Sequence, residues 1–218
     1  MNKNIDTIIF DLDGTLLDTV DDLLDSVNYA LDSCGYPKRT KDEVRLAVGN
    51  GVYTLIERML PDGKFNPDIY DVLEKFKEYY LQIKVSKTKP YDGIIELLEN
   101  LKEKNYKTGI VSNKFDKGTK LHSKVYFGDL IDYAQGEDEL NGIMRKPNPI
   151  GVYKVIKELN SKIENCIFVG DSEVDIQTAK NVGIPCISVL WGLKTKEFLI
   201  QNGGENFVSE PLEILDML

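Results

Sequence analysis

The sequence predicts an α/β fold, in which helices flank a parallel sheet and an all-helical block is inserted near the start of the chain. Two patterns favour this fold. Between residues 19 and 87, apolar side chains recur at helical spacing without strand-like runs. Beyond residue 91, short apolar runs typical of buried strands alternate with helical segments. Such alternation indicates a parallel sheet whose ligand crevice lies at the carboxyl ends of its strands.

The inserted block follows a first strand, which is the apolar run at 8–10. Apolar side chains spaced by three or four residues at 23–31 and 69–80 predict amphipathic helices within the block. Glycine, proline and asparagine predict the turns between its helices, at 35–37, 49–51, 61–63 and 66–67.

The alternating part of the chain carries the remaining strands. The expected elements are a helix at 93–104, a strand at 106–111, a helix at 117–125, a strand at 131–134, a helix at 149–159, a strand at 166–169, a helix at 174–181 and a strand at 185–190. A shorter tail follows the last of these strands. We therefore expect one parallel sheet that is covered by helices.

A pair of carboxylates follows the first strand directly. Asp11 and Asp13 are one residue apart, and because strand side chains alternate between faces, both are expected to project to the same side. Neighbouring like charges are costly to bury unless a cation neutralises them, and hard oxygen ligands favour Mg²⁺. Gly14 then permits a sharp turn out of the sheet. A strand followed by a solvated acidic turn is the alternative for this segment taken alone.

Three later segments place further chemical groups just after expected strands. Ser112 and Asn113 offer a hydroxyl and backbone N–H groups that suit a phosphate oxygen. Lys146 directly precedes a proline, which predicts extended backbone there and a helix beyond it. Asp171 and Asp175 are four residues apart, a spacing that predicts one helical face. The chain thus offers a second acidic pair at a second strand end.

Taken in order, four segments resemble the four motifs of the haloacid dehalogenase superfamily, in its phosphatase branch. They are DLDGT at 11–15, VSNK at 111–114, KPNP at 146–149 and GDSEVD at 170–175. The resemblance is best to the phosphoglycolate-phosphatase-like group, because of DLDGTLLDT at 11–19, VGNGV at 48–52, KPNP and SVLWG at 188–192. Together these motifs span nearly the whole chain.

The resemblance implies a Rossmann-like core at 1–16 and 88–218 and a helical cap domain at 17–87, with hinges near 16–19 and 84–90. A cap that closes over the site would exclude bulk water and restrict which substrates fit. Arg45 and Asn50, together with Tyr53 and Arg58, are candidate substrate contacts because they surround the glycine-flanked turn. The alternative for each is an ordinary solvated side chain on a helix surface.

The activity that the resemblance implies is Mg²⁺-dependent hydrolysis of a small phosphomonoester, such as phosphoglycolate, through an aspartyl phosphate. Asp11 would be the nucleophile, and Asp13 would protonate the leaving alkoxide and later activate water. Ser112 and the Asn113 backbone would hold the phosphoryl oxygens, while Lys146 would balance charge and position Asp11.

The same resemblance implies a set of metal ligands. The side chains of Asp11 and Asp171 and the backbone carbonyl of Asp13 would bind Mg²⁺. Asp175 would support a ligand or a metal-bound water from the second shell of the site.

Alternatives within and beyond the superfamily remain open. A dehalogenase is disfavoured because a halide leaves without the proton that Asp13 would supply. A pyrophosphatase or a sugar phosphomutase would suit the same core, although the only histidine, His122, lies outside the cap and is expected on a helix surface. A signalling switch that accepts phosphate without turnover, or an idle scaffold on this fold, would be of a different class.

Composition favours a cytoplasmic enzyme, and the resemblance implies a small phosphorylated metabolite as its partner. The 218 residues are 42% hydrophobic and 29% charged, and no apolar run is long enough for a membrane span. A net charge of -9 disfavours nucleic acid and anionic membranes as partners. Three cysteines without metal-ligand spacing are expected to be thiols. We expect a monomer or a homodimer.

Overall fold

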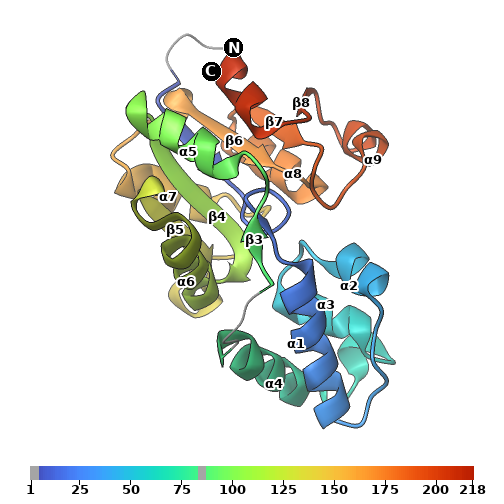
Figure 1. Cartoon of the computed structure of the whole chain (residues 1–218). Coiled ribbons are helices and arrows are strands. Elements are labelled where there is room, and N and C mark those ends of the chain that lie inside the picture. The colour runs from blue at the N-terminus through green and yellow to red at the C-terminus, as the bar shows by residue number, and fades with distance from the viewer. Residues whose placement is uncertain (1–4, 83–86) are drawn as a thin grey trace. The chain divides into compact units, whose positions relative to one another are not determined.

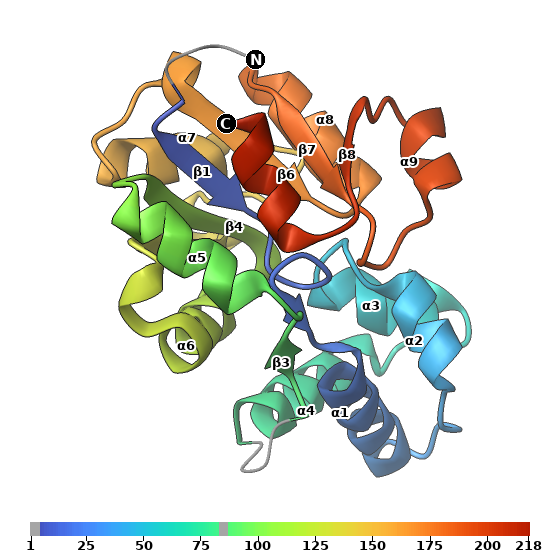
Figure 2. The same cartoon turned by 45° about the horizontal axis from the view of Figure 1, so that its top comes forward.

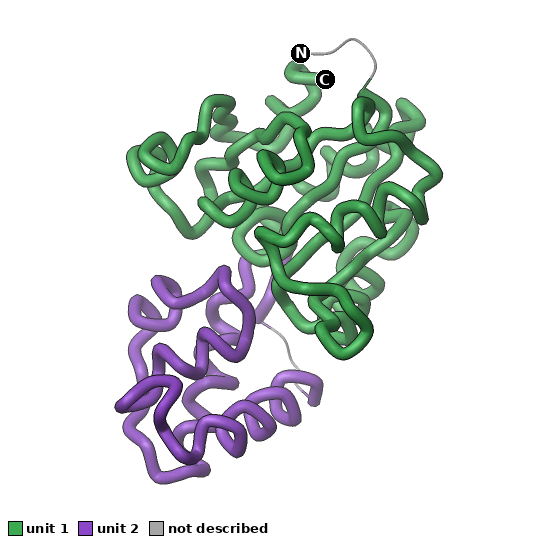
Figure 3. The backbone as a smooth tube through the Cα atoms, turned by 180° about the vertical axis from the view of Figure 1, so that it is seen from behind, with its two compact units in different colours: residues 1–17, 90–218 green, residues 18–89 purple. Residues whose placement is uncertain are grey.

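The computed structural model describes residues 5–82 and 87–218, which divide into two compact units (Figure 3). The core unit comprises Met1–Leu17 and Pro90–Leu218, and the helical unit comprises Asp18–Lys89. The expected boundaries, after residue 16 and before residue 88, differ from these by one and two residues. Part of the second expected hinge, at 84–86, lies outside the described residues.

A parallel sheet forms the centre of the core unit (Figure 1). Its strand order is β5-β4-β1-β6-β7-β8. The strands are β1 (Thr7–Phe10), β4 (Lys107–Phe115), β5 (Tyr133–Glu137), β6 (Cys166–Gly170), β7 (Cys186–Val189) and β8 (Asn206–Val208). Every strand pair in this sheet is parallel, so all carboxyl ends meet at one edge. The expected fold class, a parallel sheet with an inserted helical block, is confirmed.

Helices cover both faces of the sheet (Figure 2). On one face, α5 (Ile94–Glu103) and η5 (Pro211–Met217) bury their apolar side chains with residues such as Phe10, Ile110 and Val169. On the other face, α7 (Ile150–Glu158) and α8 (Glu173–Val182) pack against Ile9, Val111 and Phe168. The remaining helices of this unit are α6 (Asp116–Phe127), α9 (Lys196–Gln201), η2 (Gly128–Leu130), η3 (Glu139–Asn141) and η4 (Ile163–Asn165). Both faces of β1 are therefore buried, which explains its continuous apolar run.

The helical unit is built from α1 (Val20–Ser33), α2 (Lys41–Ala47), α3 (Val52–Met59), η1 (Gly63–Phe65) and α4 (Ile69–Gln82). Helix α1 packs along α4, and Val27, Leu31 and Val72 have no exposed surface. Two short strands, β2 (Leu17–Asp18) and β3 (Lys89–Pro90), pair where the chain passes between the units. No helix among the described residues is long and apolar enough to cross a membrane.

Three details differ from the sequence expectations. Strand β4 continues to Phe115, with a register shift after Val111, so Ser112 and Asn113 belong to the strand and do not follow it. The tail contains α9, the edge strand β8 and η5, whose short lengths give too little periodicity to recognise. His122 is buried in α6, since this face of the helix packs on β4 and β5, and the expectation of a surface residue was wrong.

Candidate active site

Three carboxylates from two strand ends meet at the carboxyl edge of the sheet. Asp11 follows β1, Asp171 follows β6, and Asp175 lies in the first turn of α8. One oxygen from each lies within 4.8 Å of the others, and all three residues are buried. The cluster forms because β1 and β6 are hydrogen-bonded neighbours in the sheet. The expected convergence of the first and fourth motifs is therefore present in the structure.

Asp171 reaches this cluster from a different backbone position than the spacing predicts. Helix α8 begins at Glu173 with Ser172 as its N-cap, so Asp171 precedes the helix and does not share a helical face with Asp175. Ser172 donates from its backbone N–H and its hydroxyl to Asp175 Oδ2, at 3.1 and 2.6 Å. This capping box fixes Asp175, and the bend before it places Asp171 beside Asp11.

Lys146 supplies the positive charge at the centre of the cluster. Its Nζ lies 2.7 Å from Asp11 Oδ1 and 2.6 Å from Asp175 Oδ1, and the side chain is 3% exposed. Asn113 holds the backbone of Lys146, since its Oδ1 accepts from the Lys146 N–H at 2.6 Å and its Nδ2 donates to the Lys146 carbonyl at 3.2 Å. The sequence did not predict this clamp by the Asn113 side chain.

The electrostatics of the cluster show a shortage of positive charge. Burial raises the pKa of Asp11 well above its usual value, with Lys146 opposing the shift and the other two aspartates adding to it. Burial, reinforced by Asp175, raises the pKa of Asp171 to about 7. Burial alone would lower the pKa of Lys146, but Asp11 and Asp175 together raise it. Three carboxylates with one ammonium and hard oxygen donors fit a divalent cation.

A loop after β7 fixes Asp171 to the turn that follows β1. The Leu193 N–H donates to Asp171 Oδ2 at 2.7 Å, and the indole N–H of Trp191 donates to the Thr15 carbonyl at 2.9 Å. A Cβ on Gly192 would clash with Asp171 Cβ and lie 2.5 Å from the Gly14 carbonyl. The sequence segment SVLWG indicated the subgroup, but the support that this loop gives to Asp171 was not predicted from it.

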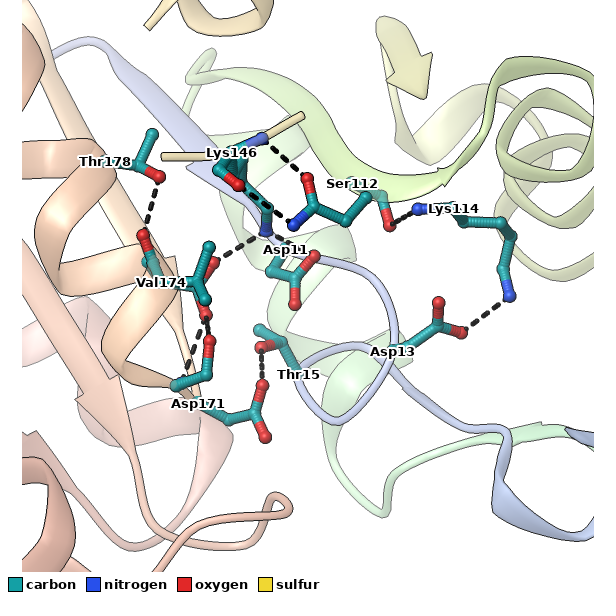
Figure 4. Close-up of polar contacts among 12 residues, drawn as sticks. Asp11, Asp13, Thr15, Ser112, Lys114, Lys146, Asp171, Val174 and Thr178 are labelled. Carbon is teal, nitrogen blue, oxygen red and sulfur yellow. Dashed lines mark hydrogen bonds and ion pairs between the residues drawn. The ribbon is translucent and has the colours of Figure 1, made fainter. Parts of the chain in front are cut away.

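Asp13 and Ser112 lie beside the cluster, and Lys114 connects them (Figure 4). Asp13 Oδ1 pairs with Lys114 Nζ at 2.9 Å, and Ser112 Oγ accepts from the Lys114 N–H at 3.1 Å. Strand β1 ends at Phe10, so strand alternation does not itself extend to Asp13, and the expectation that Asp11 and Asp13 aim at one spot stays a prediction. The Asp13 carboxylate points to Lys114 (Figure 4).

The candidate substrate contacts of the cap lie in the helical unit. Arg45 is exposed on α2, and Asn50 precedes α3 in the glycine-flanked turn. Arg58 donates to Asn50 Oδ1 at 2.8 Å and to the Ala47 carbonyl at 2.9 Å, so it supports this turn from within the same unit. The expected roles of Arg45 and Asn50 in substrate binding stay predictions.

A parallel α/β sheet with buried carboxylates and a buried lysine at its carboxyl edge is a candidate site for phosphoryl transfer. Residues 8–189 match the family described as haloacid dehalogenase-like hydrolase. The chain belongs to this family and is a hydrolase, as the resemblance of its motifs implies.

Named relatives agree with this membership. The chain is 34% identical over 186 residues to the phosphoglycolate phosphatase of Aquifex aeolicus, covering 85% of this chain and 84% of that protein. It is 32% identical over 228 residues to the phosphoglycolate phosphatase of Vibrio parahaemolyticus, covering 99% and 97%. A crystal structure from Lactobacillus delbrueckii, provisionally named a phosphoglycolate phosphatase, has a TM-score of 0.91 at 31% identity over 98% of each chain. The resemblance to the phosphoglycolate-phosphatase-like group is confirmed.

Proposed function

We propose that this protein is a Mg²⁺-dependent phosphatase that hydrolyses a small phosphomonoester of the phosphoglycolate type through an aspartyl phosphate. The observation that carries the proposal is the buried cluster of Asp11, Asp171 and Asp175, which Lys146 joins through two short ion pairs. A monoester dianion can approach a carboxylate nucleophile only where positive charge offsets the repulsion. The names of the relatives support the choice of substrate class.

The side chains of Asp11 and Asp171 and the backbone carbonyl of Asp13 would hold the Mg²⁺ ion. Asp175 would support a ligand or a metal-bound water and would not bind the ion directly, because its oxygens already accept hydrogen bonds from Lys146 and Ser172. When bound there, the ion would neutralise charge on the phosphoryl oxygens and on the nucleophile.

In this proposal each step of the reaction is assigned to a residue of the core unit. A carboxylate oxygen of Asp11 forms a bond to phosphorus as the bond from phosphorus to the leaving oxygen breaks. Asp13 gives its proton to the leaving alkoxide, and then takes a proton from the water that attacks the aspartyl phosphate. The Ser112 hydroxyl and the Asn113 N–H hold phosphoryl oxygens, and Lys146 keeps Asp11 in line. The water oxygen bonds to phosphorus as the bond from phosphorus to the Asp11 oxygen breaks, which regenerates the Asp11 carboxylate and releases inorganic phosphate.

The helical unit would serve as the cap that selects the substrate. In this proposal Arg45 and Asn50 contact the leaving group, so that small anionic metabolites are preferred. The enzyme would act in the cytoplasm as a monomer or homodimer, without nucleic acid or membrane as a partner.

A panel of phosphometabolites tests the proposal directly. With Mg²⁺ present, we expect phosphate release from phosphoglycolate or a similar small monoester, and loss of that release in excess chelator. Asp11→Asn should abolish turnover while the circular dichroism spectrum stays unchanged. Undiminished hydrolysis in chelator would contradict the metal assignment.

The same panel separates the alternatives. Preferred release from pyrophosphate would indicate a pyrophosphatase, and interconversion of sugar phosphates would indicate a mutase. A phosphorylated protein that persists without phosphate release would indicate a signalling switch.

A further inference from the structure

Lys114 is a buried cation that the proposed reaction leaves without a role. Its side chain is 4% exposed, and its Nζ lies 2.9 Å from Asp13 Oδ1 (Figure 4). Lysine is seldom buried unless it is paired, and desolvation of the lysine offsets much of what such a pair contributes to stability. The Asp13 side chain of this pair is 13% exposed. A pair of this kind beside the proposed reacting centre is better explained by a role in placing a functional group.

The backbone of Lys114 is fixed on both sides of the residue. Its N–H donates to Ser112 Oγ at 3.1 Å, and its carbonyl accepts from Thr119 Oγ1 of α6 at 3.2 Å. The stem packs closely under α6, since a Cβ on Gly118 would lie 3.3 Å from Lys114 Cδ. The ammonium group therefore projects from a rigid position on β4.

Asp13, by contrast, lies on a turn. The segment after β1 folds back on itself, with the N–H groups of Leu16 and Leu17 donating to the Leu12 carbonyl at 3.0 and 2.9 Å. The side chain of Asp13 projects from this turn toward β4. An acid on a turn needs an external anchor if its carboxyl group is to stay in one orientation.

We propose that Lys114 is a positioning residue that holds the carboxyl group of Asp13 in the orientation needed for proton transfer to the leaving group. Its backbone N–H meanwhile orients the Ser112 hydroxyl, so one residue of β4 aligns two functional groups. This inference rests on the proposed function, in which Asp13 is the acid. It assigns Lys114 no contact with the substrate.

The leaving group provides a readout that a general structural defect would not reproduce. An alkoxide leaves only when it is protonated, whereas dinitrophenolate leaves readily without a proton. Lys114→Met removes the ammonium group but keeps the stem and the backbone bond to Ser112. We expect kcat/KM for phosphoglycolate to fall by about 10–100-fold and that for dinitrophenyl phosphate to change by less than about threefold.

The ratio of the two kcat/KM values is the quantity to measure, because it does not depend on the fraction of enzyme that is folded. Lys114→Gln, whose amide can still donate to Asp13, should give an intermediate ratio. Lys120→Met is the matched control, since it breaks the exposed ion pair of Lys120 with Asp116 on α6, and it should leave the ratio unchanged. An equal loss on both substrates for Lys114→Met would overturn the inference.

A double-mutant cycle separates this inference from the function on which it rests. Asp13→Asn should lose phosphoglycolate hydrolysis by about 100-fold or more and spare dinitrophenyl phosphate. Adding Lys114→Met to Asp13→Asn should then cause no further loss, because Lys114 acts through Asp13. If the losses of the two single variants multiplied in the double variant, the inference about Lys114 would be overturned while the assignment of Asp13 as the acid would stand. An Asp13→Asn variant that loses both substrates equally would overturn the acid assignment together with the inference.

Discussion

The ammonium group of Lys146 lies 2.7 Å from Asp11 Oδ1, and this ion pair is buried at the carboxyl edge of the sheet. Asp175 shares the same ammonium at 2.6 Å. Removing the lysine would leave three buried carboxylates with no ammonium at these two short contacts. We therefore expect Lys146 to be needed for the stability of the metal-free protein as well as for the activity of the enzyme.

We expect Lys146→Met to lower the free energy of unfolding of the metal-free protein by about 3–5 kcal/mol near neutral pH, since it leaves buried charges uncompensated. Urea denaturation measures the change. Lys77→Met is the control, because Lys77 forms a more exposed ion pair with Glu74 at 2.9 Å and should cost about 1 kcal/mol or less. Equal effects of the two substitutions would contradict the importance of burial.

The raised pKa of Asp171 predicts how pH acts on the metal-free protein. Its folded-state pKa of about 7 exceeds the ordinary value, so the folded protein binds more protons than the unfolded chain between about pH 4 and about pH 7. The contribution of Asp171 to the free energy of unfolding must therefore decrease as pH rises through this window. In the proposed function Mg²⁺ binds the deprotonated form of Asp171, so the thermal shift that Mg²⁺ produces should grow over the same range. An equal Mg²⁺-induced shift at both ends of the window would argue against Asp171 as a ligand.

Gly192→Ala is expected to weaken Mg²⁺ binding more than folding. The added methyl group would clash with Asp171 and with the Gly14 carbonyl, and so would move a residue that is proposed to bind Mg²⁺. We expect a loss of about 10–100-fold in Mg²⁺ affinity, measured by calorimetry, with kcat partly restored at saturating Mg²⁺. Gln201→Ala, at an exposed position on α9, should bind Mg²⁺ normally. Normal Mg²⁺ affinity in Gly192→Ala would show that the loop after β7 does not position Asp171.

Asp22→Ala should destabilise the helical unit. The Asp22 carboxylate accepts from the N–H groups of Lys87 and Thr88, both at 2.9 Å, and from the Thr88 hydroxyl at 2.6 Å. Loss of this buried acceptor should cost about 1–3 kcal/mol by urea denaturation.

Asp25→Ala is the matched control for Asp22→Ala, since Asp25 also lies on α1 and contacts Lys87, but through an exposed ion pair at 2.6 Å. It should cost about 1 kcal/mol or less. A cost for Asp25→Ala as large as that for Asp22→Ala would contradict the importance of the buried hydrogen bonds to Asp22.

Local patterns in the sequence predicted those parts of the site that depend on strand ends. Asp11 and Asp171 follow apolar runs, and parallel strands bring such ends to one edge, so their meeting followed from fold class alone. The place of Asp171 before α8 was not predicted, because spacing by four residues is the same whether the first residue lies on the helix or before it.

Other parts of the site depend on contacts between distant residues. Trp191 and Thr15 are 176 positions apart, and no periodicity or motif links an indole to that carbonyl. Lys114 was visible in VSNK, but its pairing with Asp13 depends on how the turn after β1 folds. His122 was misplaced because the sequence does not show which face of α6 packs on the sheet.

The glycines that surround the carboxylates have a consequence for the choice of ion. A side chain on Gly14, Gly170 or Gly192 would clash with Asp171 or Asp175, so the backbone at these glycines lies close to the two carboxylates. This close packing leaves the carboxylate cluster of Asp11, Asp171 and Asp175 little room to expand around a larger ion. Calcium takes more oxygens at longer distances than magnesium does, so it should bind the carboxylate cluster more weakly than magnesium and support little activity.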